Sequence, residues 1–214
     1  MSARIETGAA AGDRRLARSA ATRAAVVEAM LGLIEFGDLQ PTAPRIAARA
    51  GVSLRSVFQH FPDLETLFAA VADRQTARLD PLLRRLAVEG PLALRVAAVA
   101  AQRARVYEAV TPVRRAALLM EPFSHEIARR LTGFRRLMRD EAARVFAAEL
   151  ATRPAAERRE LLAALAAASS FSAWHTLRRH QGLGVSAAER VVARTLHALL
   201  VGAGAAAARR GMRR

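Results

Sequence analysis

The chain has 214 residues, no cysteine and a net charge of +15, and the lack of cysteine excludes disulfide frameworks, thiolate nucleophiles and cysteine-ligated zinc sites. Its longest charge-free apolar stretches, 161–174 and 195–208, are shorter than the roughly 20 apolar residues of a membrane span, and the N-terminus lacks the pattern of a secretory signal, so we expect a cytoplasmic protein without a membrane partner. Residues 1–62 carry only +3 of the net charge and residues 63–214 carry +12, so basicity alone does not indicate a nucleic-acid-binding segment.

The pattern of apolar residues predicts an all-α fold. No segment alternates with period 2 over enough residues to make a strand, whereas apolar residues recur at three- and four-residue spacing throughout the chain. Residues 1–18 lack this periodicity and are predicted to be a flexible arm. The arginines of this arm could enter a minor groove, or the segment could be a disordered tail. The first helix is predicted over 20–36, with Gly37 as its stop.

Two short helices are predicted next, around a tight turn. The first spans 43–50, with Thr42 at its N-cap and Pro44 in its first turn, where a missing N–H costs little. Gly51 breaks it. Ser53 is placed to cap the second helix, which must end near residue 60 because position 61 precedes a proline.

The rest of the chain is predicted to be helical as well. Asp63 is placed to cap a helix over 64–88, and further helices are predicted over 91–110, 112–121, 124–150, 154–180 and 187–207. Ser186 and Glu189 fit a capping box at the start of the last one. The five histidines show no metal-ligand spacing and no glycine-rich phosphate loop is present. We therefore expect no enzyme, no metal and no cofactor.

The segment 42–61 has the pattern of a DNA-binding helix-turn-helix. Ala47 is small enough for a close helix contact, Gly51 can take the positive φ of the turn, and Val57 can fill the interface from the second helix. Ile46, Val52 and Phe61 complete the expected buried set. Once these positions face inward, the candidates for contacts with double-stranded DNA are Thr42, Arg45, Leu54, Arg55, Ser56, Phe58, Gln59 and His60.

These residue types suit base and backbone contacts. Arg55 can donate two hydrogen bonds to guanine, Gln59 can bond adenine through two atoms, and Leu54 can contact a thymine methyl group. Contacts with the DNA backbone are expected at the rim of this surface, from Thr42, Ser56, Phe58 and His60.

The same residues resemble the TetR family of transcriptional regulators. The resemblance rests on Ile46-Ala47, Ala50-Gly51-Val52-Ser53, Phe58-x-His60-Phe61 and Asp63-x-Glu65-x-Leu67-Phe68, and extends to Val26-Val27-Glu28-Ala29 upstream and to Trp174-x-x-Leu177-Arg178 and Gly182-Leu183 downstream. Two positions depart from the family. Phe58 stands where the family usually has tyrosine, and Leu64 stands where lysine is common, so two groups that usually contact phosphate are absent.

The resemblance implies a three-helix DNA-binding domain over 19–62, followed by a larger helical domain over 63–214 for effector binding and dimerisation. It implies a ligand-responsive regulator, commonly a repressor, that binds a palindromic operator as a homodimer and is released by a small-molecule effector. The alternative is a helical ligand-binding or scaffold protein of the same fold that has lost DNA binding. Phe58, Leu64 and the modest N-terminal charge favour that alternative.

Two further sets of residues are candidates for the larger domain. Uncommon aromatic and polar residues could line an effector pocket, although each is also typical of a helical core: Arg103, Tyr107, Met120, Phe123, His125, Phe134, Trp174 and His175. An anionic effector would suit Arg103 and the +12 charge, but solvated helix faces would explain this charge too. Candidates for the dimer interface, which could equally form intramolecular core, are Leu161, Leu165, Trp174, Leu196 and Leu199.

Overall fold

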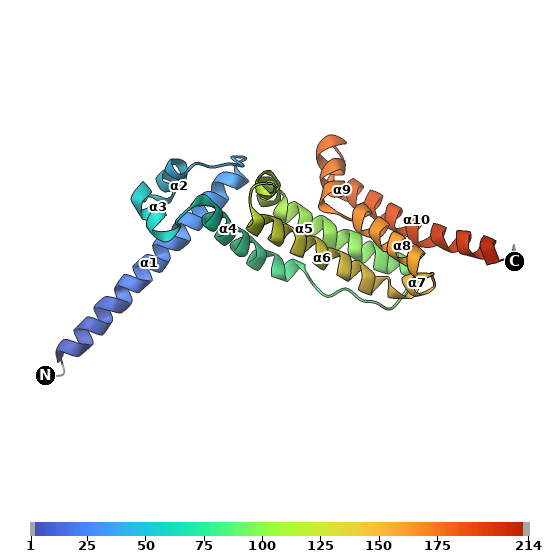
Figure 1. Cartoon of the computed structure of the whole chain (residues 1–214), viewed down its shortest axis with the longest axis horizontal. Helices are drawn as coiled ribbons and strands as arrows, with labels where there is room; N and C mark the ends of the chain where they lie inside the picture. Colours follow the sequence, from blue (N-terminus) through green and yellow to red (C-terminus); the bar gives the residue numbers. More distant parts are fainter. Residues whose placement is uncertain (1–2, 212–214) are drawn as a thin grey trace. The chain divides into compact units, whose positions relative to one another are not determined.

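The computed structural model describes the backbone of residues 3–211 and the side chains of residues 13–202, and all its regular structure is helical (Figure 1). The described residues contain no strand, so the predicted all-α fold is confirmed. The helices are α1 (Ala3–Glu35), α2 (Ala43–Ala50), α3 (Leu54–His60), α4 (Leu64–Leu79), α5 (Leu92–Met120), α6 (His125–Val145), α7 (Ala147–Ala151), α8 (Ala155–Ala168), α9 (Phe171–His175) and α10 (Val185–Gly211). Among these described helices, none is long and apolar enough to cross a membrane.

Helix α1 is longer than the sequence pattern predicts. It begins at Ala3, so residues 3–18 are helical where an irregular arm was expected; residues 1 and 2 of that arm lie outside the described residues. The expectation relied on missing apolar periodicity, which reports burial rather than helix formation. Alanine and arginine are strong helix formers, and the exposed side chains of residues 13–20 need no packing partner.

Several predicted helix boundaries were wrong. Helix α4 ends at Leu79 and gives way to a 3-10 turn (Asp80–Leu82), and α5 continues through Pro112, where a break was predicted. Helix α9 is followed by a π-helical turn (Thr176–His180). Helix α10 begins one residue before Ser186, so the predicted capping box does not form there: the N–H of Ala188 donates instead to the carbonyl of Gly184, at 2.9 Å.

The chain folds into two compact units. Unit 1 contains the described residues up to Arg78 together with Pro112–Ile127, and unit 2 contains Leu79–Thr111 and the described residues from Ala128 onwards. The predicted domain boundary between residues 62 and 63 would assign α4 to the larger domain. Ion pairs tie α4 to α1 instead, because Arg74 and Arg78 both bind Glu28, and Arg78 also binds Glu35 at 3.2 Å.

Unit 2 buries a large apolar core that includes several charged groups. Arg103 forms an ion pair with Glu141 at 2.6 Å and also donates to the backbone carbonyl of Met138 at 2.9 Å. Arg95 forms an ion pair with Glu149, and hydrogen bonding to Arg95 lowers the pKa of this carboxyl below its usual range. Each buried cation is therefore neutralised within unit 2, as burial of charge requires.

Candidate nucleic-acid interface

The turn between α2 and α3 depends on local backbone geometry that the sequence encodes. Thr42 occupies the N-cap of α2 with extended backbone angles, although its hydroxyl makes no capping hydrogen bond, contrary to the prediction. Pro44 lies in the first turn, as expected. Gly51 ends the helix at φ +66° and ψ +31°, a left-handed conformation that disfavours any residue with a Cβ atom. The predicted role of Gly51 is therefore confirmed.

Side-chain caps mark the starts of α3 and of α4. The Ser53 hydroxyl accepts a hydrogen bond from the N–H of Ser56 at 3.1 Å, so Ser53 caps α3 as predicted. Helix α3 ends at His60, and the next residue, Phe61, has an extended backbone. Asp63 accepts a hydrogen bond from the N–H of Thr66 at 2.6 Å, and this bond lowers the pKa of its carboxyl. These caps set where α3 begins and where α4 begins.

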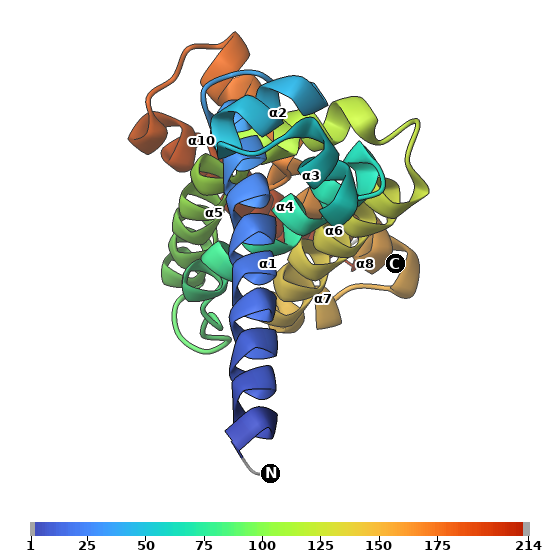
Figure 2. The same cartoon turned by 90° about the vertical axis from the view of Figure 1, so that its left-hand side faces the viewer.

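Buried residues hold α2 and α3 together against α1. Ile46 and Ala47 of α2 and Val57 and Phe61 around α3 are buried, as predicted, whereas Val52 is half-buried. Figure 2 shows α2 and α3 beside the part of α1 that contributes to this core. The two short helices therefore pack against α1 through their buried residues and leave their other side exposed.

The outward face of α3 consists of the predicted base-reading residues. Leu54, Arg55, Phe58 and Gln59 are exposed, and their spacing of three and four residues places them on one face of the helix. Ser56 and His60 lie half-buried at its edges. Within the part of the chain that the structure describes, no hydrogen bond or ion pair occupies the guanidinium group of Arg55 or the amide of Gln59.

Arginines surround this face, and one of them was missed by the sequence analysis. The exposed Arg45 forms an ion pair with Asp38 at 2.7 Å, which a phosphate would have to replace. Arg23 of α1 lies over the ring of Phe61 at the end of α3, with 4.7 Å between the guanidinium carbon and the ring centroid. No local signal points to Arg23, because only the packing of α1 against α3 brings it there.

Comparison with known proteins supplies the fold family. No protein-family model and no curated protein sequence matches the chain. Among solved structures, a TetR-family transcriptional regulator from Streptomyces coelicolor is 18% identical with a TM-score of 0.67, and the match covers 86% of this chain and 82% of that one. A transcriptional regulator from Rhodococcus sp. Rha1 is 19% identical with a TM-score of 0.63, covering 86% of this chain and 96% of that one.

A third solved structure, a Mesorhizobium loti MAFF303099 protein assigned to the TetR family of transcriptional regulators, is 19% identical with a TM-score of 0.58 over 86% of this chain and 97% of that one. The chain has the TetR-family fold. The two positions that depart from the family pattern lie in and next to α3. Phe58 is 46% exposed but has no hydroxyl to donate, and Leu64 is half-buried rather than a solvated lysine.

The predicted effector residues are divided between the two units. Met120, Phe123 and His125 belong to unit 1 and the remaining five to unit 2. Phe123 is 88% exposed between α5 and α6, and His125 is exposed as well. Arg103 is fully buried and paired with Glu141, so the structure does not present its charge to an anion. Aromatic character alone did not distinguish surface from interior positions.

Part of the set does cluster inside unit 2. The ring of Tyr107 meets that of Phe171 edge-on at 5.7 Å, and Phe171 lies at the same distance from His175. The hydroxyl of Tyr107 donates to the carbonyl of Ser169 at 2.8 Å. Trp174, three residues after Phe171, is buried in the same core, and its indole N–H donates to Glu108 at 2.9 Å. Phe134 is partly buried against this core. Phe171 was missed because its contact with Tyr107 joins residues far apart in the sequence.

The candidate dimer-interface residues lie in the core of unit 2, which is the alternative that the sequence left open. Leu161, Leu165, Trp174 and Leu196 are buried within the single chain, and Leu199 is partly buried against the same cluster. Their apolar surface is covered without a partner, so these four are not available at an interface. The helical periodicity correctly predicted an apolar face on the C-terminal helices. This face packs inside unit 2.

Proposed function

We propose that the chain is a DNA-binding transcriptional regulator, a repressor that a small molecule releases from its operator. The observation that carries this proposal is the exposed face of α3, formed by Leu54, Arg55, Phe58 and Gln59 on a helix-turn-helix that packs against α1. Arg55 would read guanine and Gln59 adenine in the major groove, because their donors and acceptors match those base edges. Such a regulator acts on DNA in the cytoplasm.

Contacts with phosphate would orient α3 in the groove. Thr42 and Arg45 lie at the start of α2, and Ser56 and His60 lie at the edges of the exposed face. Their hydroxyl, guanidinium and imidazole groups are suited to phosphate oxygens. Arg45 would exchange Asp38 for phosphate, which costs little at a solvent-exposed pair.

Recognition of an operator also requires two copies of the chain. One helix of seven residues covers too few base pairs for useful specificity, whereas two copies related by a two-fold axis read a palindrome. The exposed sides of α8 and α10, which pack against each other, are our candidate interface. Their small and apolar exposed residues would allow close helix packing: Ala156, Ala163, Ala167, Val191, Ala198 and Val201.

Release by an effector would follow from a change in the spacing of the two α3 helices. Successive major grooves are about 34 Å apart, and a dimer with another spacing loses one half-site. The effector must bind the released conformation more tightly than the DNA-bound one for this to happen. Among the predicted pocket residues, Tyr107 and His175 share the aromatic neighbour Phe171, and this cluster is our candidate wall of the effector site.

Selection of bound sequences from a random duplex pool tests the proposal. Arg84→Ala is the matched control for Arg55→Ala, because both positions are exposed arginines and Arg84 lies in unit 2. Wild type and Arg84→Ala should enrich one palindrome, whereas Arg55→Ala should lose a base preference within it. If wild type enriches no palindrome, the regulator proposal fails and the second candidate is favoured.

That second candidate is a helical ligand-binding or scaffold protein of the same fold. Phe58 and Leu64 favour it, because neither can donate a hydrogen bond to phosphate. Sedimentation of the purified protein separates the two further, since a monomer at micromolar concentration would contradict the dimer on which operator recognition depends.

A further inference from the structure

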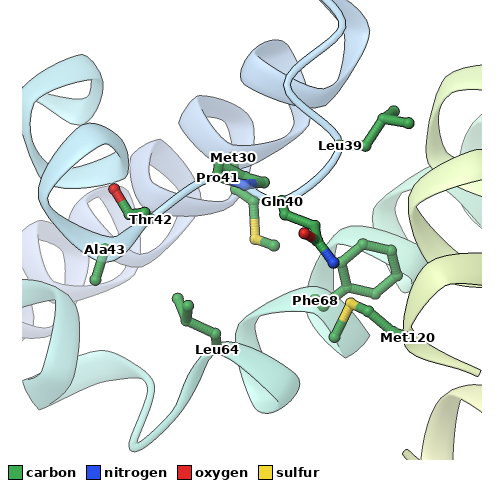
Figure 3. A pocket seen from close by; sticks show the side chains of 9 residues that line it. All are labelled: Met30, Leu39, Gln40, Pro41, Thr42, Ala43, Leu64, Phe68 and Met120. Carbon is green, nitrogen blue, oxygen red and sulfur yellow. The ribbon is translucent and has the colours of Figure 1, made fainter. Parts of the chain in front are cut away.

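A cavity in unit 1 lies directly behind the start of α2. It has a volume of about 290 Å³, and all nine of its lining residues belong to unit 1. Figure 3 shows Met30 of α1, Gln40 of the α1–α2 loop, Leu64 and Phe68 of α4 and Met120 of α5 around it. The remaining lining residues are Leu39, Pro41, Thr42 and Ala43. The cavity therefore joins the helix-turn-helix to α4 and to the end of α5.

We propose that this cavity binds a small, neutral, largely apolar molecule with one polar group. The site belongs to unit 1, whereas the aromatic cluster belongs to unit 2, and its occupancy does not depend on the proposed regulator function. The chemistry of the lining residues carries the proposal.

The size of the cavity limits the ligand to a compact molecule. Ligand pockets usually measure about 300–1,000 Å³, and an apolar cavity of about 150 Å³ already holds benzene. A space of about 290 Å³ therefore suits one or two fused rings or a short aliphatic chain rather than a drug-sized compound.

The polarity of the lining residues decides the charge of the ligand. None of the nine is ionisable, and an ion placed there would lose hydration without gaining a counter-charge. Met30, Pro41, Ala43 and Phe68 are buried and form an apolar floor. Gln40 and Thr42 are the exposed polar members, so the polar group of the ligand would point towards them. Methionine side chains adapt readily to ligands of different shape and make favourable contacts with aromatic rings.

The location links the site to DNA. Thr42 lines the cavity and is also one of our candidate phosphate contacts, and Ala43 is the first residue of α2. A ligand that contacts these residues would change the affinity of unit 1 for DNA, and DNA would change its affinity by the same factor.

Methionine methyl NMR with indole as the probe tests the site without DNA. Indole is neutral, has two fused rings and carries one N–H, which can donate a hydrogen bond to the side-chain carbonyl oxygen of Gln40. The chain has five methionines, of which Met30 and Met120 line the cavity and Met138 is buried in unit 2. The methyl signals of Met30 and Met120 should shift saturably as indole is added, whereas that of Met138 should stay in place.

Two variants provide the controls. Leu64→Phe fills the cavity and should abolish the saturable shifts, whereas Leu86→Phe, at another half-buried leucine, should leave them unchanged. Ala43→Val also reduces the cavity, from the first residue of α2, and replaces Leu64→Phe if that variant loses the Met138 signal of the folded protein. Gln40→Met should lower the affinity of the cavity for indole by about threefold. The affinity for toluene, which has no N–H, should stay the same. Equal shifts at all three methionines, no shift up to the solubility of indole, or shifts that persist in the filled variants would overturn the proposal.

Discussion

Replacement of Glu141 by glutamine tests whether the buried charge of Arg103 depends on its partner. The Arg103 side chain has no exposed surface and that of Glu141 is 12% exposed. Gln102 also donates to both carboxylate oxygens, at 2.7 and 2.9 Å. Glutamine has the shape of glutamate but no charge, and its NH2 group would face the donors of Arg103 or Gln102. The substitution therefore leaves the buried cation without a counter-ion.

The expected loss of stability is large for a change of a few atoms. Removing one partner of a buried ion pair costs about 3–5 kcal/mol, since the other charge stays buried. In a protein of this length each kcal/mol shifts the melting temperature by about 2–4 °C, so Glu141→Gln should melt roughly 6–20 °C lower than wild type. Replacement of both partners, in Arg103→Met with Glu141→Leu, should recover most of this loss, because no unpaired charge remains.

Urea unfolding followed by circular dichroism measures these differences. The matched control is Asp140→Asn on the adjacent residue, which removes the same charge from an exposed pair with Arg136 and should cost no more than about 0.5 kcal/mol. A loss for Glu141→Gln no greater than that of Asp140→Asn would refute the reasoning, as would a double variant less stable than Glu141→Gln.

Four further substitutions, one of them a control, test the fold and the proposed interface. Gly51→Ala should lower stability by about 1–2 kcal/mol in urea unfolding, since alanine is strained at φ +66°, whereas Gly133→Ala within α6 should raise it by about 0.5–1 kcal/mol; equal effects would contradict the assigned backbone. The pKa of Glu149 is lowered in the folded protein, so its pairing with Arg95 stabilises the fold fully above the ordinary pKa of 4.5 and less as the pH falls towards the folded pKa. Arg95→Met should therefore show a weaker loss of stability below pH 4.5 than wild type in acid unfolding, and an unchanged pH profile would argue against this pair. Phe58→Tyr should bind the selected duplex about three- to tenfold more tightly by fluorescence anisotropy, because the hydroxyl can donate to phosphate, and an unchanged affinity would remove position 58 from the interface.

Local chemistry made the helix-turn-helix predictable from the sequence. The left-handed turn at Gly51 and the caps at Ser53 and Asp63 depend on residues within a few positions of one another. Burial of Ala47 and Val57 also followed from their spacing in the two short helices. These features correspond to the part of the chain where residue type and backbone geometry are tightly coupled.

Long-range packing limited the rest of the prediction. Periodicity identifies an apolar face but not the surface that covers it. The sequence therefore left open whether Leu165 and Leu196 meet a partner chain or the interior, and they lie inside unit 2. The exposure of Phe123 and the position of Arg23 over Phe61 likewise arise from how distant helices meet. No signal within the helix-turn-helix itself indicates that a cavity lies behind α2.

The central claim is that the exposed face of α3 reads DNA bases. Fluorescence anisotropy on the selected duplex, with each base pair replaced in turn, tests it for wild type, Gln59→Ala and the charge control Arg84→Ala. Wild type and Arg84→Ala should lose roughly 5- to 150-fold in affinity at the same symmetric positions, as expected for about 1–3 kcal/mol per mismatch. Gln59→Ala should no longer discriminate at one symmetric pair of these positions. An identical position dependence for all three proteins would contradict the claim that α3 carries the base contacts.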